Sequence, residues 1–314
     1  MSLTQLRYFH EVARSGSIRV ASERLHVTAS SISRQIKNLE FEAGMPLFDR
    51  SSSGMSLTSA GELYLAYARS VLFDLDRLHS QIDDLKGLRR GRVRIGTIEG
   101  VVSDTLIPAI AAFRGRYPGV TFQVRTMASD MIPDALSSGD VDLGIAYNAE
   151  PHLDVRFAFR ISDPLQAIVH RNHPIGRLRQ VGLAEALAYP VAVPEEYFGI
   201  RRLLDQSCRA ERLRLKPALV TNSIEALRAF ARTNAGVTML PVLSTRADLE
   251  RGTVVAVPFR EAALRRSSVD VCVAAGRKPT VAADAFLLHF QKVCTDASVG
   301  AEPLERAESR EEVS

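Results

Sequence analysis

The 314-residue sequence has no tryptophan and only three cysteines, Cys208, Cys272 and Cys294, which lie far apart. An odd number of scattered cysteines excludes a disulfide framework and is typical of a reducing cytoplasm. No apolar run approaches the roughly 20 residues that cross a bilayer. The first ten residues also lack the basic and apolar segments of a secretory signal. We therefore expect a cytoplasmic protein with no membrane partner.

Signatures of catalysis are equally scarce. The sequence contains no phosphate loop, no G-x-S-x-G motif and no Rossmann glycine run. Its seven histidines are dispersed, and the pair His170 and His173 has no further metal-ligand type nearby. Cys208 lies next to Arg209 but has no resolving thiol for oxidant sensing. We expect no enzyme activity, no bound metal and no cofactor.

Charge is distributed unevenly along the chain. The net charge is +4, but the last 14 residues contain five Glu and two Arg, so residues 1–300 carry +7. Between Arg14 and Lys37 there are five basic residues and one acidic residue, Glu23. Such a local basic cluster suggests a polyanionic partner.

The first 58 residues are predicted to form short helices followed by a hairpin. Gly16 ends the first helix, Ser17 caps the second and Thr28 caps the third. In the third helix, Ile32, Ile36 and Leu39 fall on one face, as a core-facing helix requires. Two helices joined by a short turn, the second with one apolar face, are typical of a helix-turn-helix. Residues 47–57 form the expected hairpin.

A long helix follows, for which Ser59 and Glu62 are a candidate capping box. Its apolar residues alternate spacings of four and three over three heptads, at Tyr64, Ala68, Val71, Leu75, Leu78, Ile82 and Leu85. This pattern predicts a coiled-coil seam between two chains. The alternative is a helix packed on its own domain. The run from Gly87 to Gly91 ends the helix in a linker.

From Arg92 onward, predicted strands and helices alternate. Strands are expected at residues 93–98, 120–127, 141–147 and 269–274, with others around 192, 220, 237–240 and 254–257. Helices are expected at residues 105–116, 131–138 and 281–293. Alternation of this kind predicts α/β domains with mostly parallel sheets. The polar tail from Ala301 to Ser314 is expected to be disordered.

Several motifs together resemble the LysR-type transcriptional regulators. In the N-terminal part they are Leu6-Arg7-Tyr8-Phe9, Ala21-Ser22-Glu23-Arg24-Leu25, Leu47-Phe48-Asp49-Arg50 and Leu57-Thr58-Ser59-Ala60-Gly61. Further along they are Arg94-Ile95-Gly96, Ser138-Gly139-Asp140-Val141-Asp142-Leu143 and Asn234-Ala235-Gly236-Val237-Thr238. The resemblance covers about residues 3–296.

The resemblance implies an N-terminal all-α winged helix-turn-helix with a long linker helix, and a C-terminal α/β effector domain with two lobes, like the periplasmic binding proteins. The implied boundaries are 1–58 for DNA binding, 59–90 for the linker and dimerisation helix, 91–300 for the effector domain and 301–314 for the tail. Lobe one would comprise about 91–162 and 268–300, and lobe two about 163–267. The implied partners are double-stranded DNA, a small-molecule effector, a second copy in a homodimer or homotetramer, and RNA polymerase.

The third helix carries the expected DNA contacts. With its apolar face turned inward, the side chains of Ser30, Ser33, Arg34 and Lys37 point away from the core, and a helix of this kind fits the major groove. Thr28 at the helix N-terminus is a candidate phosphate ligand. Contacts to backbone phosphate are expected from the hairpin, at Arg50, Ser52 and Ser53. Ala29 departs from the family pattern, because it cannot hydrogen-bond a base edge, so an unusual operator sequence is expected.

Effector contacts are expected where strands end, because open α/β sheets bind ligands at that edge. By the resemblance, these loops face one cleft between the lobes. The candidates are Thr97, Glu99, Gly100, Ser103, Met127, Ser129, Tyr147, Phe198, Thr221, Asn222 and Ser223. Glu99 leaves two alternatives. If Glu99 faces the cleft, its charge would repel an anionic effector and favour an amine or a hydroxyl group. If it faces solvent, it gives no information about the effector.

Two other classes of protein compete with a regulator. The C-terminal part alone resembles a solute-binding receptor, and the two-lobed fold also occurs in enzymes. The absent signal peptide and the helix-turn-helix argue against the receptor, and the absent catalytic residues argue against the enzyme. We therefore expect a DNA-binding transcriptional regulator controlled by a small molecule.

Overall fold

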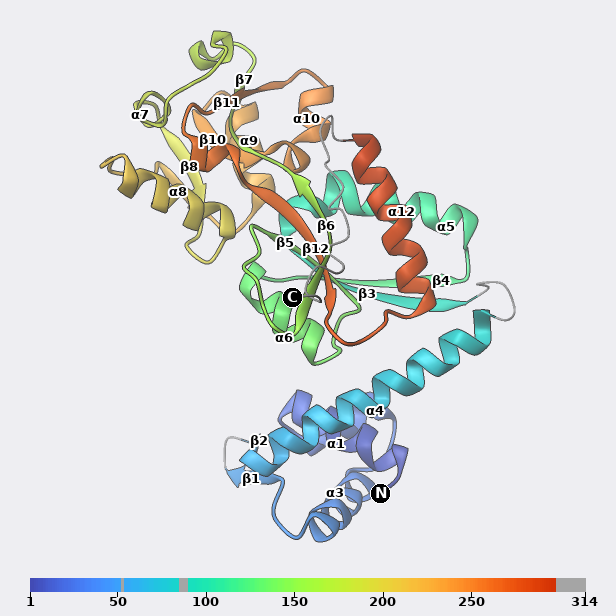
Figure 1. Ribbon diagram of the computed structural model, residues 1–314. Helices are drawn as coiled ribbons and strands as arrows, with labels where there is room; N and C mark the ends of the chain where they lie inside the picture. Colours follow the sequence, from blue (N-terminus) through green and yellow to red (C-terminus); the bar gives the residue numbers. More distant parts are fainter. Residues whose placement is uncertain (52–53, 85–89, 298–314) are drawn as a thin grey trace, which may run out of the picture. The chain divides into compact units, whose positions relative to one another are not determined.

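The computed structural model describes residues 1–51, 54–84 and 90–297, in two compact units that meet after Leu85. The first unit contains four helices and a hairpin (Figure 1). Its elements are α1 (Leu3–Ser15), α2 (Ile18–Leu25), α3 (Ala29–Ala43), β1 (Phe48–Ser51), β2 (Gly54–Leu57) and α4 (Ser59–Asp84). The expected helix-turn-helix and hairpin are both present. The acidic tail lies outside the described residues.

Local caps and one small core explain these helices. Ser17 Oγ accepts a hydrogen bond from Val20 N, and Thr28 Oγ1 accepts one from Ser31 N, as expected for N-caps. Gly16 ends α1 with φ 63°, a left-handed conformation that glycine adopts without strain. Ile32, Ile36 and Leu39 are fully buried, so α3 presents the predicted face to the core.

The start of α4 differs from the expected capping box. Thr58 Oγ1 accepts a hydrogen bond from Gly61 N at 3.0 Å, so Thr58 caps the helix and Ser59 is its first residue. The same hydroxyl donates to Pro46 O at 2.9 Å, which ties the helix start to the segment before the hairpin. The assignment of Ser59 and Glu62 as the capping box is therefore wrong, because this second contact favours Thr58.

The predicted seam of α4 is divided. Ala68 is fully buried in the core of the first unit, and Tyr64 and Val71 pack against that core. For this half, the alternative of a helix packed on its own domain is right. Leu78, in contrast, is 50% exposed. The side chain of Ile82 and all of Leu85 lie outside the described part of the chain.

The second unit has two lobes, each built on a five-stranded sheet. The sheet of lobe one has the order β4-β3-β5-β12-β6. Its strands are β3 (Gly91–Thr97), β4 (Val120–Thr126), β5 (Leu143–Tyr147), β6 (Val155–Ser162) and β12 (Ser268–Ala274). Helices α5 (Ile107–Arg116) and α12 (Val281–Ala297) cover one face and α6 (Ile132–Ser137) covers the other (Figure 1).

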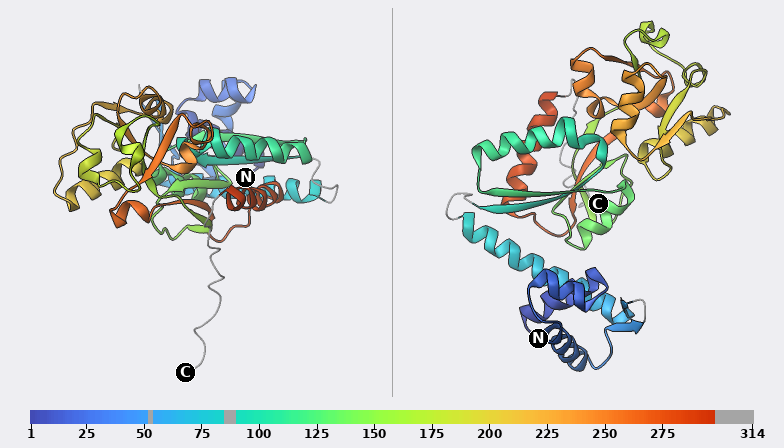
Figure 2. Two further views of the ribbon diagram at one scale, coloured as in Figure 1. Left: turned by 90° about the horizontal axis from the view of Figure 1, so that it is seen from above. Right: turned by 180° about the vertical axis from the view of Figure 1, so that it is seen from behind.

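Lobe two has the strand order β11-β7-β10-β8-β9. Its strands are β7 (Leu165–His170), β8 (Val191–Pro194), β9 (Leu219–Thr221), β10 (Val237–Pro241) and β11 (Val254–Pro258). Its helices are α7 (Leu183–Ala186), α8 (Gly199–Ala210), α9 (Ile224–Arg232), α10 (Arg246–Glu250) and α11 (Ala262–Arg265). Figure 2 shows both lobes from two further sides.

Both sheets are mixed rather than mostly parallel, which corrects the expectation from the sequence. β3 pairs in parallel with β4 and β5, and β8 with β9 and β10, but β12 and β7 pair antiparallel with both of their neighbours. Strand–helix alternation predicts only the parallel pairs that a crossover helix connects. The antiparallel pairs involve β6, β7 and β12, the strands next to the crossings between the lobes. Of these, β6 and β7 were not among the strands expected from the sequence.

The chain crosses between the lobes at Asp163 and again at Ser267. The two crossings are hydrogen-bonded to each other, since Asp163 N donates to Ser267 O at 3.0 Å and Leu165 N donates to Ser267 Oγ at 3.1 Å. The Asp163 carboxylate accepts hydrogen bonds from the backbone N–H groups of Val242 and Leu243. Burial raises the pKa of Asp163 to about 7. The crossings thus form a buried, internally bonded hinge.

Candidate DNA-binding surface and effector pocket

The exposed face of α3 carries two basic side chains without an ion-pair partner among the described residues, Arg34 and Lys37. Three other arginines of the first unit lie in ion pairs: Arg14 and Arg24 share Glu11, and Arg19 pairs with Glu23. A helix that presents unpaired cations beside its solvent-facing residues attracts a polyanion. The charge on α3 is therefore available to a partner.

The other predicted contacts on α3 surround its N-terminus. Thr28 and Ser30 are exposed, their hydroxyl oxygens lie 3.1 Å apart, and Ser33 is half-buried. Thr28 also caps the helix through Ser31 N, at 3.3 Å. These hydroxyls lie at the positive end of the helix dipole, where a phosphate oxygen is stabilised.

The hairpin is fixed to α3 by Glu40, in the last turn-and-a-half of that helix. Glu40 Oε1 accepts hydrogen bonds from Leu47 N at 3.1 Å and Phe48 N at 3.3 Å. Arg50, on β1, is exposed and lies 3.9 Å from the other carboxylate oxygen of Glu40. At that distance the ion pair is weak, and Arg50 keeps its charge for a partner. Ser52 and Ser53 lie outside the described residues.

A cavity of about 270 Å³ lies between the lobes of the second unit. Lobe one and lobe two both contribute to its wall. The lining residues are Ile98, Glu99, Thr126, Met127, Ala128, Ser129, Tyr197, Phe198, Gly199 and Asn222. Five of the predicted effector residues are among them: Glu99, Met127, Ser129, Phe198 and Asn222.

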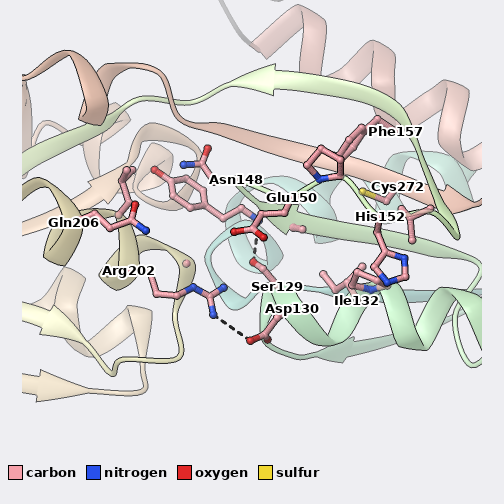
Figure 3. A pocket seen from close by; sticks show the side chains of 18 residues that line it. Ser129, Asp130, Ile132, Asn148, Glu150, His152, Phe157, Arg202, Gln206 and Cys272 are labelled. Carbon is pink, nitrogen blue, oxygen red and sulfur yellow. Dashed lines mark hydrogen bonds and ion pairs between the residues drawn. The ribbon is translucent and has the colours of Figure 1, made fainter.

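A larger cavity of about 510 Å³ lies next to the first, and Ser129 and Gly199 line both (Figure 3). Tyr147 lines the larger one, and its backbone N donates to Ser129 Oγ at 3.1 Å. A Cβ at position 199 would lie 3.1 Å from Tyr147 O, so glycine allows α8 to approach β5 closely. Arg202 and Asp130 form an ion pair of 3.1 Å across the lobes (Figure 3).

The remaining predicted effector residues line neither cavity. Thr97 is fully buried and donates to Ile98 O, and Gly100 is buried against Ser244. Thr221 Oγ1 accepts from Ser223 N, and Ser223 caps α9. Ser103 Oγ accepts from Arg228 Nη1 at 3.3 Å. These polar groups satisfy backbone or side-chain partners, which explains their presence without a ligand.

Five cavity residues were outside the prediction: Ile98, Thr126, Ala128, Tyr197 and Gly199. Thr126 is the last residue of β4, one position before the loop where contacts were expected. Tyr197 lies in the loop after β8, next to Phe198. Strand ends therefore located loops that line this cavity, but which of their residues face it depends on how the two lobes approach each other.

Glu99 faces the cavity, which decides between the two alternatives that the sequence left open. Its Oε1 accepts a hydrogen bond from Ile224 N, in the first turn of α9, at 3.1 Å. Burial raises the pKa of Glu99, and Glu225 adds to the rise, whereas the bond from Ile224 opposes it. A carboxylate of the protein itself thus occupies the N-terminus of α9.

A buried ion network joins the lobes beside this cavity. Arg228, on α9, contacts Asp104 of lobe one at 3.2 Å and Asp248 of lobe two at 2.7 Å. The side chains of these three residues are at most 7% exposed. Asp104 Oδ2 also accepts from Ala247 N at 3.0 Å. The Arg228 guanidinium therefore bridges one carboxylate from each lobe, and Arg232 adds a second cation to Asp248.

The fold and these two surfaces define a DNA-binding regulator with a ligand-binding domain, and comparison with known proteins agrees. Residues 3–62 match the bacterial regulatory helix-turn-helix proteins of the lysR family, and residues 86–295 match the LysR substrate binding domain. The chain belongs to the LysR family of transcriptional regulators. Proteins of this family are not enzymes, which confirms that expectation.

Curated relatives and solved structures show the same similarity. The transcriptional dual regulator GltC of Bacillus subtilis is 29% identical over 268 residues, 85% of this chain and 89% of GltC. The transcriptional activator CmpR of a Synechocystis strain is 27% identical over 244 residues, 77% of this chain and 80% of CmpR. Full-length CbnR in complex with its target DNA has the same fold, with a TM-score of 0.61, 20% identity, and coverage of 95% of this chain and all of CbnR.

Residues 1–51, 54–84 and 90–297 lack two further features. No helix there is long and apolar enough to cross a membrane. In the same residues, no group of three or more His, Cys, Asp or Glu side chains is arranged to hold a metal ion.

Proposed function

We propose that this regulator reads its operator with α3, positions itself through the hairpin, and responds to a small molecule in the 270 Å³ cavity. The unpaired Arg34 and Lys37 on the exposed face of α3 carry this proposal. Arg34 forms a bidentate contact with guanine, and Lys37 contacts guanine or phosphate. Arg50 contacts backbone phosphate, with Thr28, Ser30, Ser33, Ser52 and Ser53 as further contacts.

The functional division that we propose follows the expected boundaries: 1–58 for DNA binding, 59–90 for dimerisation and 91–300 for the effector. In this proposal the cavity between the lobes is the effector site, because residues of both lobes line it. A ligand bound there contacts both lobes, so it changes the free-energy difference between an open and a closed arrangement of the lobes. We further propose that the protein acts in the cytoplasm and contacts RNA polymerase. The names of GltC and CmpR describe different regulatory outcomes, and we assign neither to this chain.

Replacing Arg34 by alanine is expected to weaken operator binding by about 1–3 kcal/mol, with a smaller loss on random DNA, because a base contact disappears. Arg50→Ala is the comparison: it removes a phosphate contact, so it weakens both DNAs alike and reduces the salt slope of log K by about 1. Fluorescence anisotropy with the DNA upstream of its own gene and with a scrambled duplex measures both effects. Equal losses on the two duplexes for Arg34→Ala would refute base reading.

We propose dimerisation through α4 because apolar residues on this helix are exposed to solvent in the single chain. Leu63 is 77% exposed and Leu78 is 50% exposed, whereas Tyr64 and Ala68 serve the core of their own unit. In this proposal the contact between chains lies on the solvent-facing side of α4, and pairs of dimers form the tetramer.

The double substitution Leu63→Asp and Leu78→Asp is expected to halve the mass of the dimer, because two charges enter an apolar contact. Light scattering after size-exclusion chromatography measures the mass. Leu153→Asp is the control, since Leu153 is exposed in a loop of the second unit. An unchanged mass for the double variant would place the contact between chains elsewhere.

A further inference from the structure

The small cavity between the lobes is lined by few charged side chains. Of its ten lining residues, Glu99 is the one carboxylic acid, and no Lys, Arg or His is among them. Its other polar groups are uncharged: the hydroxyls of Thr126, Ser129 and Tyr197 and the amide of Asn222. The lining thus offers no side-chain cation to a carboxylate or phosphate.

Arginines on neighbouring elements are committed to other partners. Arg202 pairs with Asp130, and Arg228 pairs with Asp104 and Asp248. Arg201 donates to Asp205 and to Pro194 O. Arg125 precedes Thr126 on β4, and because successive strand residues point to opposite faces, it points away from the cavity. None of these charges is free to hold an anion in the cavity.

The Glu99 carboxylate lies at the N-terminus of α9, a position that stabilises negative charge. Its Oε1 accepts the hydrogen bond from Ile224 N at the start of α9, where the helix dipole stabilises negative charge. Its Oε2 has no hydrogen-bond partner among the described residues, while the side chain lines the cavity. A carboxylate held this way presents one acceptor to a ligand and repels a second carboxylate.

Two aromatic rings complete the site. Tyr197 and Phe198 line the cavity with ring centroids 4.7 Å apart. The negative face of an aromatic ring attracts an organic cation, most strongly where water is excluded. The volume of about 270 Å³ lies just below the usual range for drug-sized ligands, so the ligand is small.

Building on the proposed effector role of this cavity, we propose that the ligand is a small organic cation, an amine or quaternary ammonium compound. Its charged group contacts Glu99, and its alkyl part lies against Met127, Tyr197 and Phe198. The N-terminus of α8, which begins at Gly199, is the one feature of the described cavity wall that attracts an anion. An anionic ligand is therefore the competing outcome of the test.

The test uses the full chain and three probes of similar size: butylammonium, choline and butyrate. Isothermal titration or the shift in melting temperature measures binding to wild type. We expect both cations to bind about tenfold or more tightly than butyrate, and Glu99→Gln to weaken the cations by about tenfold or more. Glutamine keeps the shape and an acceptor for Ile224 N, and the melting temperature without ligand verifies that the variant is folded.

Glu195→Gln is the matched control, because Glu195 lies in the same lobe-two loop as Tyr197 but does not line the cavity. It is expected to leave cation affinity within about twofold of wild type. This control distinguishes a direct contact with the Glu99 carboxylate from a nonspecific effect of removing one negative charge near the cavity. Tighter binding of butyrate, equal cation affinity in Glu99→Gln, or no binding of any probe would overturn the inference. The proposed function fails separately, if cations bind but neither operator affinity nor transcription changes.

Discussion

Replacing Arg228 by alanine is expected to destabilise the second unit by about 3 kcal/mol or more, because the buried Asp104 carboxylate loses its cation, whereas Asp248 keeps Arg232 and Arg251. Asp104 and Asp248 are 7% and 1% exposed, and Arg228 contacts both. For a unit of this size, such a loss corresponds to a fall of roughly 10 °C in melting temperature. Calorimetry at neutral pH measures it.

Arg251→Ala is the control for the same cluster. Arg251 contacts Asp248 at 3.5 Å but is 66% exposed, so its removal is expected to cost less than about 1 kcal/mol. Equal melting temperatures for the two variants at neutral pH would show that the Arg228 ion pairs do not stabilise the second unit.

Replacing Gly61 by alanine is expected to abolish operator binding, although the same change usually stabilises a helix. A Cβ at position 61 would lie 2.0 Å from Leu47 O and 3.0 Å from Leu57 Cδ2. Leu47 O accepts a hydrogen bond from Thr58 N, so the start of α4 and the start of the hairpin must both move. The loss of this packing is expected to cost about 2 kcal/mol or more.

Gly115→Ala provides the opposite result in the same protein. Gly115 lies in α5, and a Cβ there meets no atom within 4 Å. Alanine at this position is expected to stabilise by about 0.5–1 kcal/mol, the ordinary effect of removing glycine from a helix. Chemical denaturation followed by circular dichroism compares the variants, and anisotropy measures operator binding. Normal binding by Gly61→Ala would show that the hairpin tolerates the shift.

Short-range signals explain why the first unit was predictable. The caps at Ser17 and Thr28 and the buried positions Ile32, Ile36 and Leu39 depend on residues within one or two helical turns. The capping box at Ser59 failed because Thr58 has a second partner, Pro46 O, twelve residues away. Contacts over that range leave no periodic pattern in the sequence.

The heptad pattern of α4 shows the limit of periodicity. It correctly indicated an apolar face, but the same face packs on the core of its own unit at Ala68 and is exposed at Leu78. A repeat of apolar residues states which side of a helix avoids water, and it does not state which partner covers that side. Tertiary contacts of α1 with α4 made that choice.

By itself, the sequence determined the family, the helix-turn-helix with its hairpin, the α/β character of the second unit and the loops at the strand ends, because motifs and periodicities are local. Only the tertiary structure decided the mixed strand order, the cavity and the position of Glu99 in its wall. The cavity wall combines Glu99, Thr126, Tyr197 and Asn222, which come from both lobes and are separated by up to 123 residues of chain. Which side chains meet there depends on the approach of two lobes joined by crossings at Asp163 and Ser267, and no local pattern encodes that approach.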